Sequence, residues 1–266
     1  MPCTLISNLN NSLKKLLSKI INLKKVPRIF SVPEHTRVYC IGDIHGRYDL
    51  LIDLHNKIVL DSEGFSGKKL LIYLGDYIDR GLYSKEVVDL LLTQPVEGFE
   101  AIYLRGNHEQ VLLDFLNLDP NIASQWFNFG GLATVFSYGL AIKGIPVGDD
   151  LKQIQQDLIN KIPTEHISFY SHLQHSFEYG DYFFVHAGVK PKVALSHQSE
   201  LDMMWIREEF LNSKFCHPKM IVHGHSVSKQ PIVLSNRIGI DTGAYYSDIL
   251  TCLILEGEHK RFLATS

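Results

Sequence analysis

Three apolar runs in the first half of the chain each end in a glycine followed by a polar residue, and this feature constrains the fold most strongly. The runs cover 38–41, 69–74 and 100–104, and they end at Gly42-Asp43, Gly75-Asp76 and Gly106-Asn107. Segments with helical spacing separate them at 49–60 and 84–92. This alternation predicts an α/β layered fold whose first strands pair in parallel. The carboxyl ends of such strands gather at one sheet edge, where binding sites are commonly built.

The rest of the chain divides into a helical stretch and a stretch rich in short strands. Helical spacing covers 111–118, 122–138, 151–162 and 164–173, which we interpret as a helical insert over about 111–174. A hairpin is predicted from 176–179 and 182–186, with its turn at Gly180-Asp181. Further short strands are predicted at 220–223, 232–234, 238–241 and 250–255. The second half is therefore expected to hold an antiparallel or mixed sheet.

Composition narrows the class of protein. Hydrophobic residues make up 45% and charged residues 21%, which excludes collagen, coiled coil and wholesale disorder. A chain of 266 residues can bury a large core without disulfides or a structural metal. The net charge of -3 argues against a nucleic-acid-binding protein, and the absence of a long apolar stretch argues against a transmembrane helix. The four cysteines form no CxxC pair, which predicts free thiols in a reducing, cytoplasmic setting.

The first 33 residues differ from the rest in charge. They hold six of the 26 basic residues and none of the 29 acidic ones, so the remainder carries a net charge of -9. Residues 8–25 have the spacing of an amphipathic helix with a leucine and isoleucine face and a lysine face, and Pro27 and Pro33 end it. We divide the chain into this helix and linker (1–33) and a main domain (34–266). The helix either packs on that domain or contacts an anionic membrane surface at the cytoplasmic side.

Five short blocks carry residue types that bind metal ions, and each follows or closes a predicted strand. The blocks are Gly42-Asp43-Ile44-His45-Gly46, Gly75-Asp76-Tyr77-Ile78-Asp79-Arg80-Gly81, Gly106-Asn107-His108-Glu109, His186-Ala187-Gly188 and His223-Gly224-His225. Mixed carboxylate, imidazole and amide ligands suit divalent manganese, iron or zinc. The glycines let the backbone pass close to ions and phosphate.

In this order, the five blocks resemble the signature of the calcineurin-like metallophosphoesterases, over residues 42–225. The first three resemble the phosphoprotein phosphatase branch, and the overall form is similar to the bacterial and bacteriophage serine/threonine protein phosphatases. The resemblance implies a four-layer αββα sandwich, with two mixed sheets flanked by helices and a helical insert. It also implies that 34–266 is a catalytic domain that hydrolyses phosphomonoesters, with a phosphoprotein or phosphopeptide as substrate.

The resemblance implies a dinuclear metal centre. The implied ligands are Asp43 and His45 for the first ion, Asp76 for both ions, and Asn107, His186 and His225 for the second. Manganese is the favoured metal, with iron and zinc as alternatives. In this family a hydroxide that bridges the two ions attacks phosphorus in line, without a covalent enzyme intermediate.

Four residues are assigned roles in proton transfer and phosphate binding by the same resemblance. His108 matches the general acid that protonates the leaving oxygen, and Asp79 would orient it. Arg80 matches a phosphate-binding arginine, and Arg207 is the best match for a second one. Asn107 and His108 would also contact the phosphate.

Other candidate residues leave alternatives open. His223 is either a ligand or a support for His225, and the family pattern favours the support. A tyrosine in the 241–246 segment would wall the site, unless the segment is an ordinary turn. The aromatic residues of 126–138 face either the substrate or the core. The eight remaining histidines are interpreted as structural: His35, His55, His166, His172, His175, His197, His217 and His259.

Three features of the sequence bear on the alternative functions. Many nucleases and cyclic-nucleotide phosphodiesterases of the superfamily end in Gly-His-x-His, but Ser226 and Val227 follow His225 here. The related dinucleoside polyphosphate hydrolases typically carry GDLVxRGP, whereas this chain has Asp79, and Leu82 after Gly81. A catalytically silent binding scaffold is disfavoured because the ligand set is intact. Nothing in the sequence indicates an oligomeric state.

Overall fold

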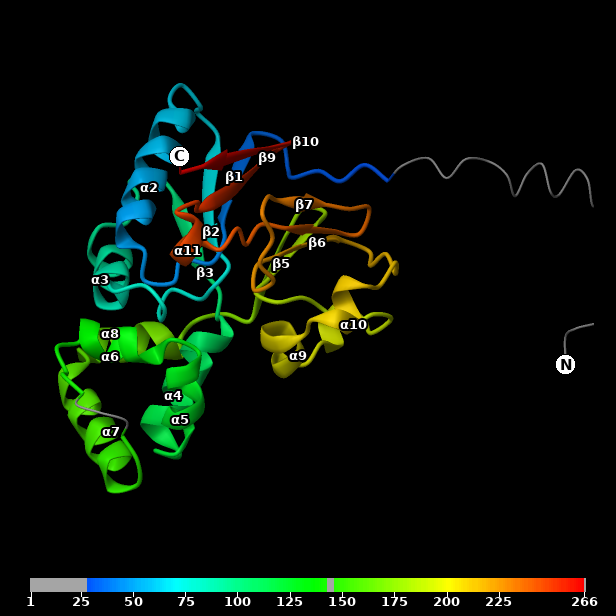
Figure 1. The fold of residues 1–266 in the computed structure, drawn as a ribbon. Helices are drawn as coiled ribbons and strands as arrows, with labels where there is room; N and C mark the ends of the chain where they lie inside the picture. The colour runs from blue at the N-terminus through cyan, green and yellow to red at the C-terminus, as the bar shows by residue number, and fades with distance from the viewer. Residues whose placement is uncertain (1–27, 143–145, 266) are drawn as a thin grey trace, which may run out of the picture.

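Two five-stranded sheets stack against each other, with helices on their outer faces (Figure 1). The computed structural model describes residues 28–142 and 146–265. The first sheet has the order β10 (His259–Ala264), β9 (Thr251–Glu256), β1 (Thr36–Ile41), β2 (Lys68–Tyr73) and β3 (Glu100–Tyr103). The second has the order β4 (Ser176–Tyr179), β5 (Tyr182–Val185), β6 (Met220–His223), β8 (Arg237–Gly239) and β7 (Ile232–Val233).

Both sheets are mixed. In the first, β1 pairs in parallel with β2 and β2 with β3, as the alternation of strands and helices predicts, while β9 pairs antiparallel with β1. In the second, β5, β6 and β8 are parallel, and β4 and β7 are antiparallel edge strands. The expected αββα sandwich with two mixed sheets is confirmed.

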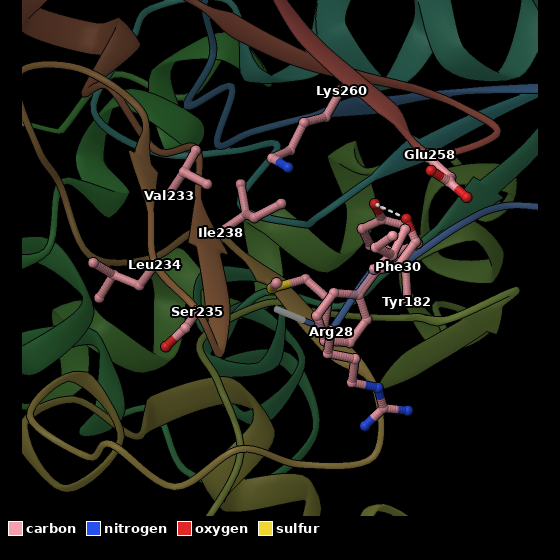
Figure 2. A pocket seen from close by; sticks show the side chains of 11 residues that line it. Arg28, Phe30, Tyr182, Val233, Leu234, Ser235, Ile238, Glu258 and Lys260 are labelled. Carbon is pink, nitrogen blue, oxygen red and sulfur yellow. Dashed lines mark hydrogen bonds between the residues drawn. The ribbon is translucent and has the colours of Figure 1, made fainter. Parts of the chain in front are cut away.

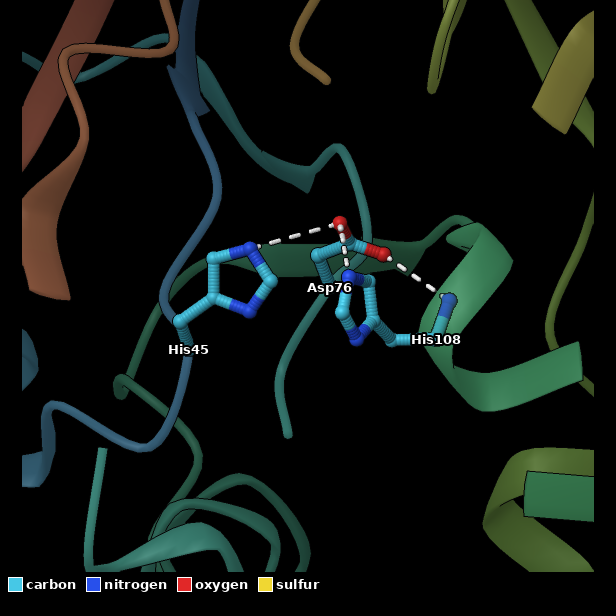
Figure 3. A group of neighbouring side chains, drawn as sticks. All are labelled: His45, Asp76 and His108. Carbon is cyan, nitrogen blue, oxygen red and sulfur yellow. Dashed lines mark hydrogen bonds and ion pairs between the residues drawn. The ribbon is translucent and has the colours of Figure 1, made fainter. Parts of the chain in front are cut away.

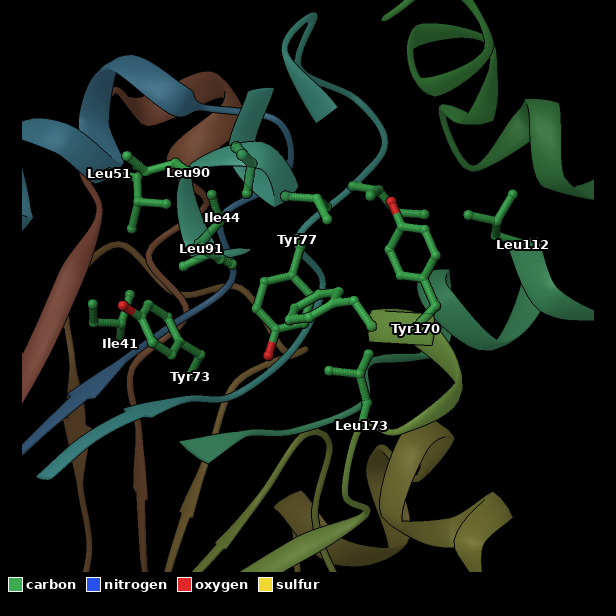
Figure 4. Packing of buried hydrophobic residues seen from close by; sticks show 14 of the residues in the cluster. Ile41, Ile44, Leu51, Tyr73, Tyr77, Leu90, Leu91, Leu112, Tyr170 and Leu173 are labelled. Carbon is green, nitrogen blue, oxygen red and sulfur yellow. The ribbon is translucent and has the colours of Figure 1, made fainter. Parts of the chain in front are cut away.

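Side chains that alternate along the strands fill the layers on either side of each sheet. Between the sheets, Val38 and Ile72 belong to one buried cluster with Phe184 and Val222. On the other face of the first sheet, the strands pack against α2 (Tyr48–Ser62) and α3 (Ser84–Thr93), with Tyr73 in that cluster (Figure 4). The second sheet packs its outer face against α9 (Glu200–Trp205) and α10 (Glu208–Leu211). Strands buried on both faces explain the continuous apolar runs in the sequence.

Five helices lie between β3 and β4. They are α4 (Asn107–Asn117), α5 (Ile122–Asn128), α6 (Gly131–Ser137), α7 (Asp149–Lys161) and α8 (Thr164–Ser171). The single helix expected over 122–138 is wrong: the chain breaks at Gly130, whose φ of 102° is left-handed and cannot continue a helix. The break sets α5 and α6 as two short helices whose aromatic and hydroxyl side chains reach the site described below.

Several elements were not predicted. They are α9, α10, the short helix α11 (Ala244–Ser247), the 3₁₀ turn Leu195–His197 and the strand β10. These helices are short, and β10 is largely exposed with a charged start, so neither gives a clear periodic signal. The predicted amphipathic helix over 8–25 lies outside the described residues. Within the described part of the chain, no helix is long and apolar enough to cross a membrane.

Candidate metal centre and active site

The predicted blocks converge at the carboxyl ends of strands from both sheets. Asp43 and His45 follow β1, Asp76 follows β2, and β3 leads into the first turn of α4 with Asn107 and His108. From the second sheet, His186 follows β5 and His225 follows β6. Each of these side chains is buried, with 0–6% of its surface exposed. The structure places all six residues that the resemblance implied as metal ligands at this edge of the sheets. Four of them, His45, Asp76, His186 and His225, belong to groups whose ligand atoms lie within 4.8 Å of one another, whereas Asp43 belongs to neither group.

The backbone at this edge is unusually strained. Five non-glycine residues of the blocks adopt left-handed φ values: His45 (48°), Asp76 (53°), Asp79 (71°), Arg80 (68°) and His225 (61°). Such conformations are costly for residues with a β-carbon and persist where the surroundings enforce them, which is common at functional sites.

Asp76 lies between two groups of side chains that could each hold a metal ion. One group is His45, Asp76 and His108, and the other is Asp76, His186 and His225. The Oδ2 atom of Asp76 lies 3.4 Å from Nε2 of His45 (Figure 3), and its Oδ1 atom lies 3.4 Å from Nε2 of His186. One carboxylate oxygen faces each group, as a bridging ligand requires.

Backbone carbonyls fix the orientation of two of the rings. Nδ1 of His45 lies 2.8 Å from the Ile78 carbonyl, and Nδ1 of His186 lies 2.9 Å from the Leu74 carbonyl. Because a carbonyl only accepts, each Nδ1 carries the proton and each Nε2 is unprotonated, so it can accept from a donor or bind a metal ion. This arrangement is typical of metal-ligating histidines, whose second nitrogen donates to the protein.

The charges at the site fit bound cations. Oδ1 of Asp43 and Nε2 of His225 are buried and have no hydrogen-bond partner among the described residues. Burial raises the pKa of Asp43 well above its usual range, and the neighbouring Asp241 and Asp76 carboxylates raise it further. Burial also raises the pKa of Asp241 to about 6. Buried carboxylates this close together need a compensating positive charge, which divalent ions would supply.

The protonation states of the other groups agree with this reading. Burial alone would raise the pKa of Asp76, but the neighbouring His186, His108 and His45 hold it below its usual range. Burial lowers the pKa of His225 to about 2 and keeps the ring neutral, which is the form that binds a metal.

His108 belongs to the first of the two metal-binding groups, and it also forms a pair with Asp79. Nδ1 of His108 lies 2.6 Å from Oδ2 of Asp79. Burial lowers the pKa of His108, but the charge of Asp76 and the hydrogen bond to Asp79 outweigh it and raise the pKa above its ordinary value. The His108 ring is thus hydrogen-bonded to the carboxylate that the sequence predicted would orient it.

Two residues that hold Asp79 lie on the helices between β3 and β4. The indole of Trp126 donates to Oδ2 of Asp79 at 2.8 Å, and the hydroxyl of Thr134 donates to Oδ1 at 2.6 Å. The backbone N–H of Asp79 donates to the Thr134 hydroxyl and to that of Ser84. For the 126–138 segment the sequence left two interpretations open, contact with the substrate or packing in the core. Trp126 of this segment is fully buried. No sequence signal indicated Thr134.

Glu109 stands in the third block but had no predicted role. Its carboxylate accepts hydrogen bonds from the backbone N–H groups of Asp76, Tyr77, Ile78 and Gly106 at 2.8–3.3 Å. Four donors fix both oxygens, and the bonds tie the start of α4 to the loop after β2. Glu109 therefore sets the positions of Asp76 and of His108 relative to each other.

The two candidate phosphate-binding arginines lie at the open side of the site. Nη1 of Arg80 lies 3.0 Å from Nε2 of His45, and its guanidinium stacks on the ring of Tyr245 with its central carbon 4.7 Å from the ring centroid. Tyr245 belongs to the 241–246 segment, so a tyrosine of that segment does wall the site. Arg207 is exposed at the start of α10; burial lowers the pKa of His186 and His225, and the positive charge of Arg207 lowers both slightly further.

The histidines interpreted as structural include two buried ones with hydrogen-bond partners outside the metal-binding groups. His55 pairs with Tyr73, and His166 pairs with Tyr138 and Asp89.

A pocket of about 420 Å³ lies where the described chain begins, lined by Arg28, Phe30, Tyr182 and Leu234 among others (Figure 2). None of the predicted site residues lines this pocket, so it is separate from the metal centre.

The chain belongs to the calcineurin-like phosphoesterase family, which matches residues 36–229. The protein is therefore a metallophosphoesterase, a class of hydrolase with a dinuclear metal centre.

Relatives of two kinds are similar to this chain. The chain is 38% identical over 88 residues to the serine/threonine-protein phosphatase PP2A-like PPG1 of Candida albicans, a match that covers 33% of this chain and only 20% of that protein. It is 24% identical over 233 residues to the asymmetrical bis(5'-nucleosyl)-tetraphosphatase PrpE of Halalkalibacterium halodurans, covering 80% of this chain and 87% of that one. A solved structure provisionally assigned as a diadenosine tetraphosphatase has a TM-score of 0.59 at 21% identity, covering 90% of this chain and 99% of that one.

Proposed function

We propose that the protein is a serine/threonine protein phosphatase. The observation that carries the proposal is the His108–Asp79 pair, joined at 2.6 Å directly beside the shared carboxylate of Asp76. A serine or threonine oxygen is a poor leaving group, so its departure depends on a proton donor held in position. The local 38% identity to a serine/threonine-protein phosphatase supports the same substrate class.

The proposed metal ligands are the six residues that the sequence indicated. Two divalent ions held there would supply positive charge to neutralise the phosphoryl oxygens and to activate water as the nucleophile. We propose manganese as the metal, with iron and zinc as the alternatives, because the donor set mixes carboxylate, imidazole and amide groups. Buried Oδ1 of Asp43 and Nε2 of His225, which lack partners among the described residues, support two of the assignments.

The chain's own residues orient the phosphate and its leaving group. Arg80 offers a planar set of donors next to His45 and His108, and its stacking on Tyr245 restrains it. Arg207 adds a second positive charge from the side of His186 and His225. Both arginines bind the non-bridging oxygens in this proposal, together with Asn107 and His108.

The proton moves from Nε2 of His108 to the leaving oxygen as the phosphorus–oxygen bond breaks. Nδ1 stays hydrogen-bonded to Asp79, so the ring cannot turn away and its pKa stays raised. Trp126 also donates to Oδ2 of Asp79 and Thr134 donates to Oδ1, which keeps the carboxylate aimed at the ring.

A second candidate is the asymmetrical cleavage of dinucleoside tetraphosphates. The observation that favours it is the extent of similarity: the tetraphosphatase relative matches 80% of this chain, whereas the protein phosphatase relative matches 33%. The metal-binding blocks serve either reaction, because both break a phosphorus–oxygen bond.

One assay separates the two candidates. The full chain is stripped of metal, reloaded with Mn²⁺ and tested on a panel of phosphoserine and phosphothreonine peptides and, in parallel, on diadenosine tetraphosphate. Phosphate release from peptides at a much higher kcat/KM supports the protein phosphatase. A higher kcat/KM for the dinucleotide supports the second candidate instead. Inactivity on both substrates with two bound ions points to a binding scaffold.

We also propose a cytoplasmic protein whose residues 8–25 contact an anionic membrane surface. The proposal rests on the lysines that flank a leucine and isoleucine face in the sequence. Sedimentation of the full chain with phosphatidylserine vesicles tests it, with Lys14→Glu/Lys15→Glu as the variant. Loss of binding in the variant supports the contact, and equal binding of both proteins contradicts it.

A further inference from the structure

Arg237 and His223 form a buried pair behind the turn that carries His225. His223 closes β6 and is 1% exposed, while Arg237 opens β8 and is 6% exposed. Nη1 of Arg237 lies 3.0 Å from Nε2 of His223. Phe210 of α10 packs its ring against the imidazole, with 5.1 Å between the ring centroids. The pair is therefore enclosed, although neither residue faces the candidate metal ions.

The arginine decides which nitrogen of His223 carries the proton. A guanidinium can only donate, so Nε2 of His223 must accept. The proton then lies on Nδ1, which donates to the carbonyl oxygen of Gly224 at 2.9 Å. A ring with the other tautomer would present two acceptors to each other at Gly224 and two donors to each other at Arg237.

Backbone hydrogen bonds around Gly224 reach residues assigned to both metal ions. Its N–H donates to the carbonyl of His186 at 2.8 Å, and the next N–H, of His225, donates to Oδ2 of Asp43 at 2.9 Å. His225 has a left-handed φ of 61°, so the peptide before it needs external support. A β-carbon on Gly224 would collide with the Asp43 carboxylate, so the turn has no room to shift.

We propose that Arg237 and His223 are positioning residues that fix the Gly224 carbonyl and thereby aim Nε2 of His225 at the second metal ion. His223 is then neither a ligand nor an ordinary core histidine, and the buried arginine has a role that its burial alone does not explain. The inference depends on His225 as a ligand, and it does not depend on which phosphate ester is the substrate.

The decisive experiment compares His223→Leu with His223→Asn in the full chain, with Mn²⁺ alone as the probe. Leucine and asparagine share the same branched shape, but only asparagine can donate to the Gly224 carbonyl. Titration of the metal-free protein followed by electron paramagnetic resonance counts the bound ions and their affinities. We expect His223→Leu to weaken the binding of one of the two ions about 10- to 100-fold, and His223→Asn to stay within about threefold of the unsubstituted protein.

Two further variants keep the test decisive. His55→Leu removes another buried histidine, which bonds to Tyr73 away from the metals, and it should lower the melting temperature without changing Mn²⁺ affinity. Arg237→Met leaves Nε2 of His223 without its donor and should weaken one ion about 3- to 10-fold, with partial recovery in Arg237→Lys. If His223→Leu does not fold, the Mn²⁺ affinity of Arg237→Met becomes the deciding measurement.

Two results overturn the inference. One is an unchanged Mn²⁺ affinity in His223→Leu that folds. If His223→Leu does not fold, an unchanged Mn²⁺ affinity in Arg237→Met has the same meaning. The other is an equal loss in His223→Leu and His223→Asn, because packing and not the hydrogen bond would then hold the turn. Both readouts are metal affinities, so a failure of the protein phosphatase proposal leaves them unaffected.

Discussion

The two sides of Asp76 are built in different ways. On the metal-binding side, the side chains follow strands of both sheets, and main-chain carbonyls at Leu74 and Ile78 orient the rings of His186 and His45. On the proton-donor side, His108 depends on Asp79, which in turn depends on side chains of α5 and α6. The first side is a consequence of sheet topology, whereas the second depends on how the helices between β3 and β4 pack. Substitutions on the two sides should therefore change different observables.

The largest effect is expected where the two sides meet. Asp76→Asn removes the carboxylate that faces both groups, so Mn²⁺ binding and activity should be lost together, with kcat/KM reduced about 10³-fold or more. Asp53→Asn is the control, because Asp53 is an exposed residue of α2 paired with Lys57. Metal counting and phosphate release are measured on the same samples. Retention of both ions at full occupancy in Asp76→Asn would show that this carboxylate does not bridge.

A substitution on the proton-donor side should leave the metals in place. Asp79→Asn removes the hydrogen-bonded charge that helps to raise the pKa of His108. His108 must be protonated to act, so activity falls as pH rises through its pKa, and a lower pKa moves this fall to lower pH. We expect the basic limb of kcat for a phosphoserine peptide to move to lower pH, with two ions still bound. An unshifted basic limb would separate Asp79 from the proton donor.

A smaller effect is expected one step further from the reaction. Thr134→Val deletes the hydroxyl that bonds to both the side chain and the backbone of Asp79, whereas Thr134→Ser keeps it. The valine variant should lose about 1–3 kcal/mol of stability in urea unfolding and several-fold in kcat, with Mn²⁺ affinity unchanged. The serine variant should lie close to the unsubstituted protein. Equal behaviour of the two variants would mean that the hydroxyl does not support Asp79.

The same contrast explains what could be predicted from the sequence. The strand-end blocks are local signals, so the parallel pairs of the first sheet and the clustering of Asp43, Asp76 and His186 followed from them. The support of Asp79 by Thr134 joins residues 55 positions apart through tertiary packing, which has no local signal. The break at Gly130 was missed for a different reason: the Gly130-Gly131 pair is a local signal for a break, but the apolar spacing continues through it and favoured one helix.

The most direct test of the account measures how the His108→Ala variant acts on two leaving groups. With a phosphoserine peptide, whose leaving oxygen needs a proton, kcat should fall about 10²- to 10⁴-fold. With p-nitrophenyl phosphate, whose leaving group needs little protonation, the fall should be far smaller while both Mn²⁺ ions remain bound. Equal losses on the two substrates would contradict the assignment of His108 as the proton donor, and with it the division of the site into a metal-binding side and a proton-donor side.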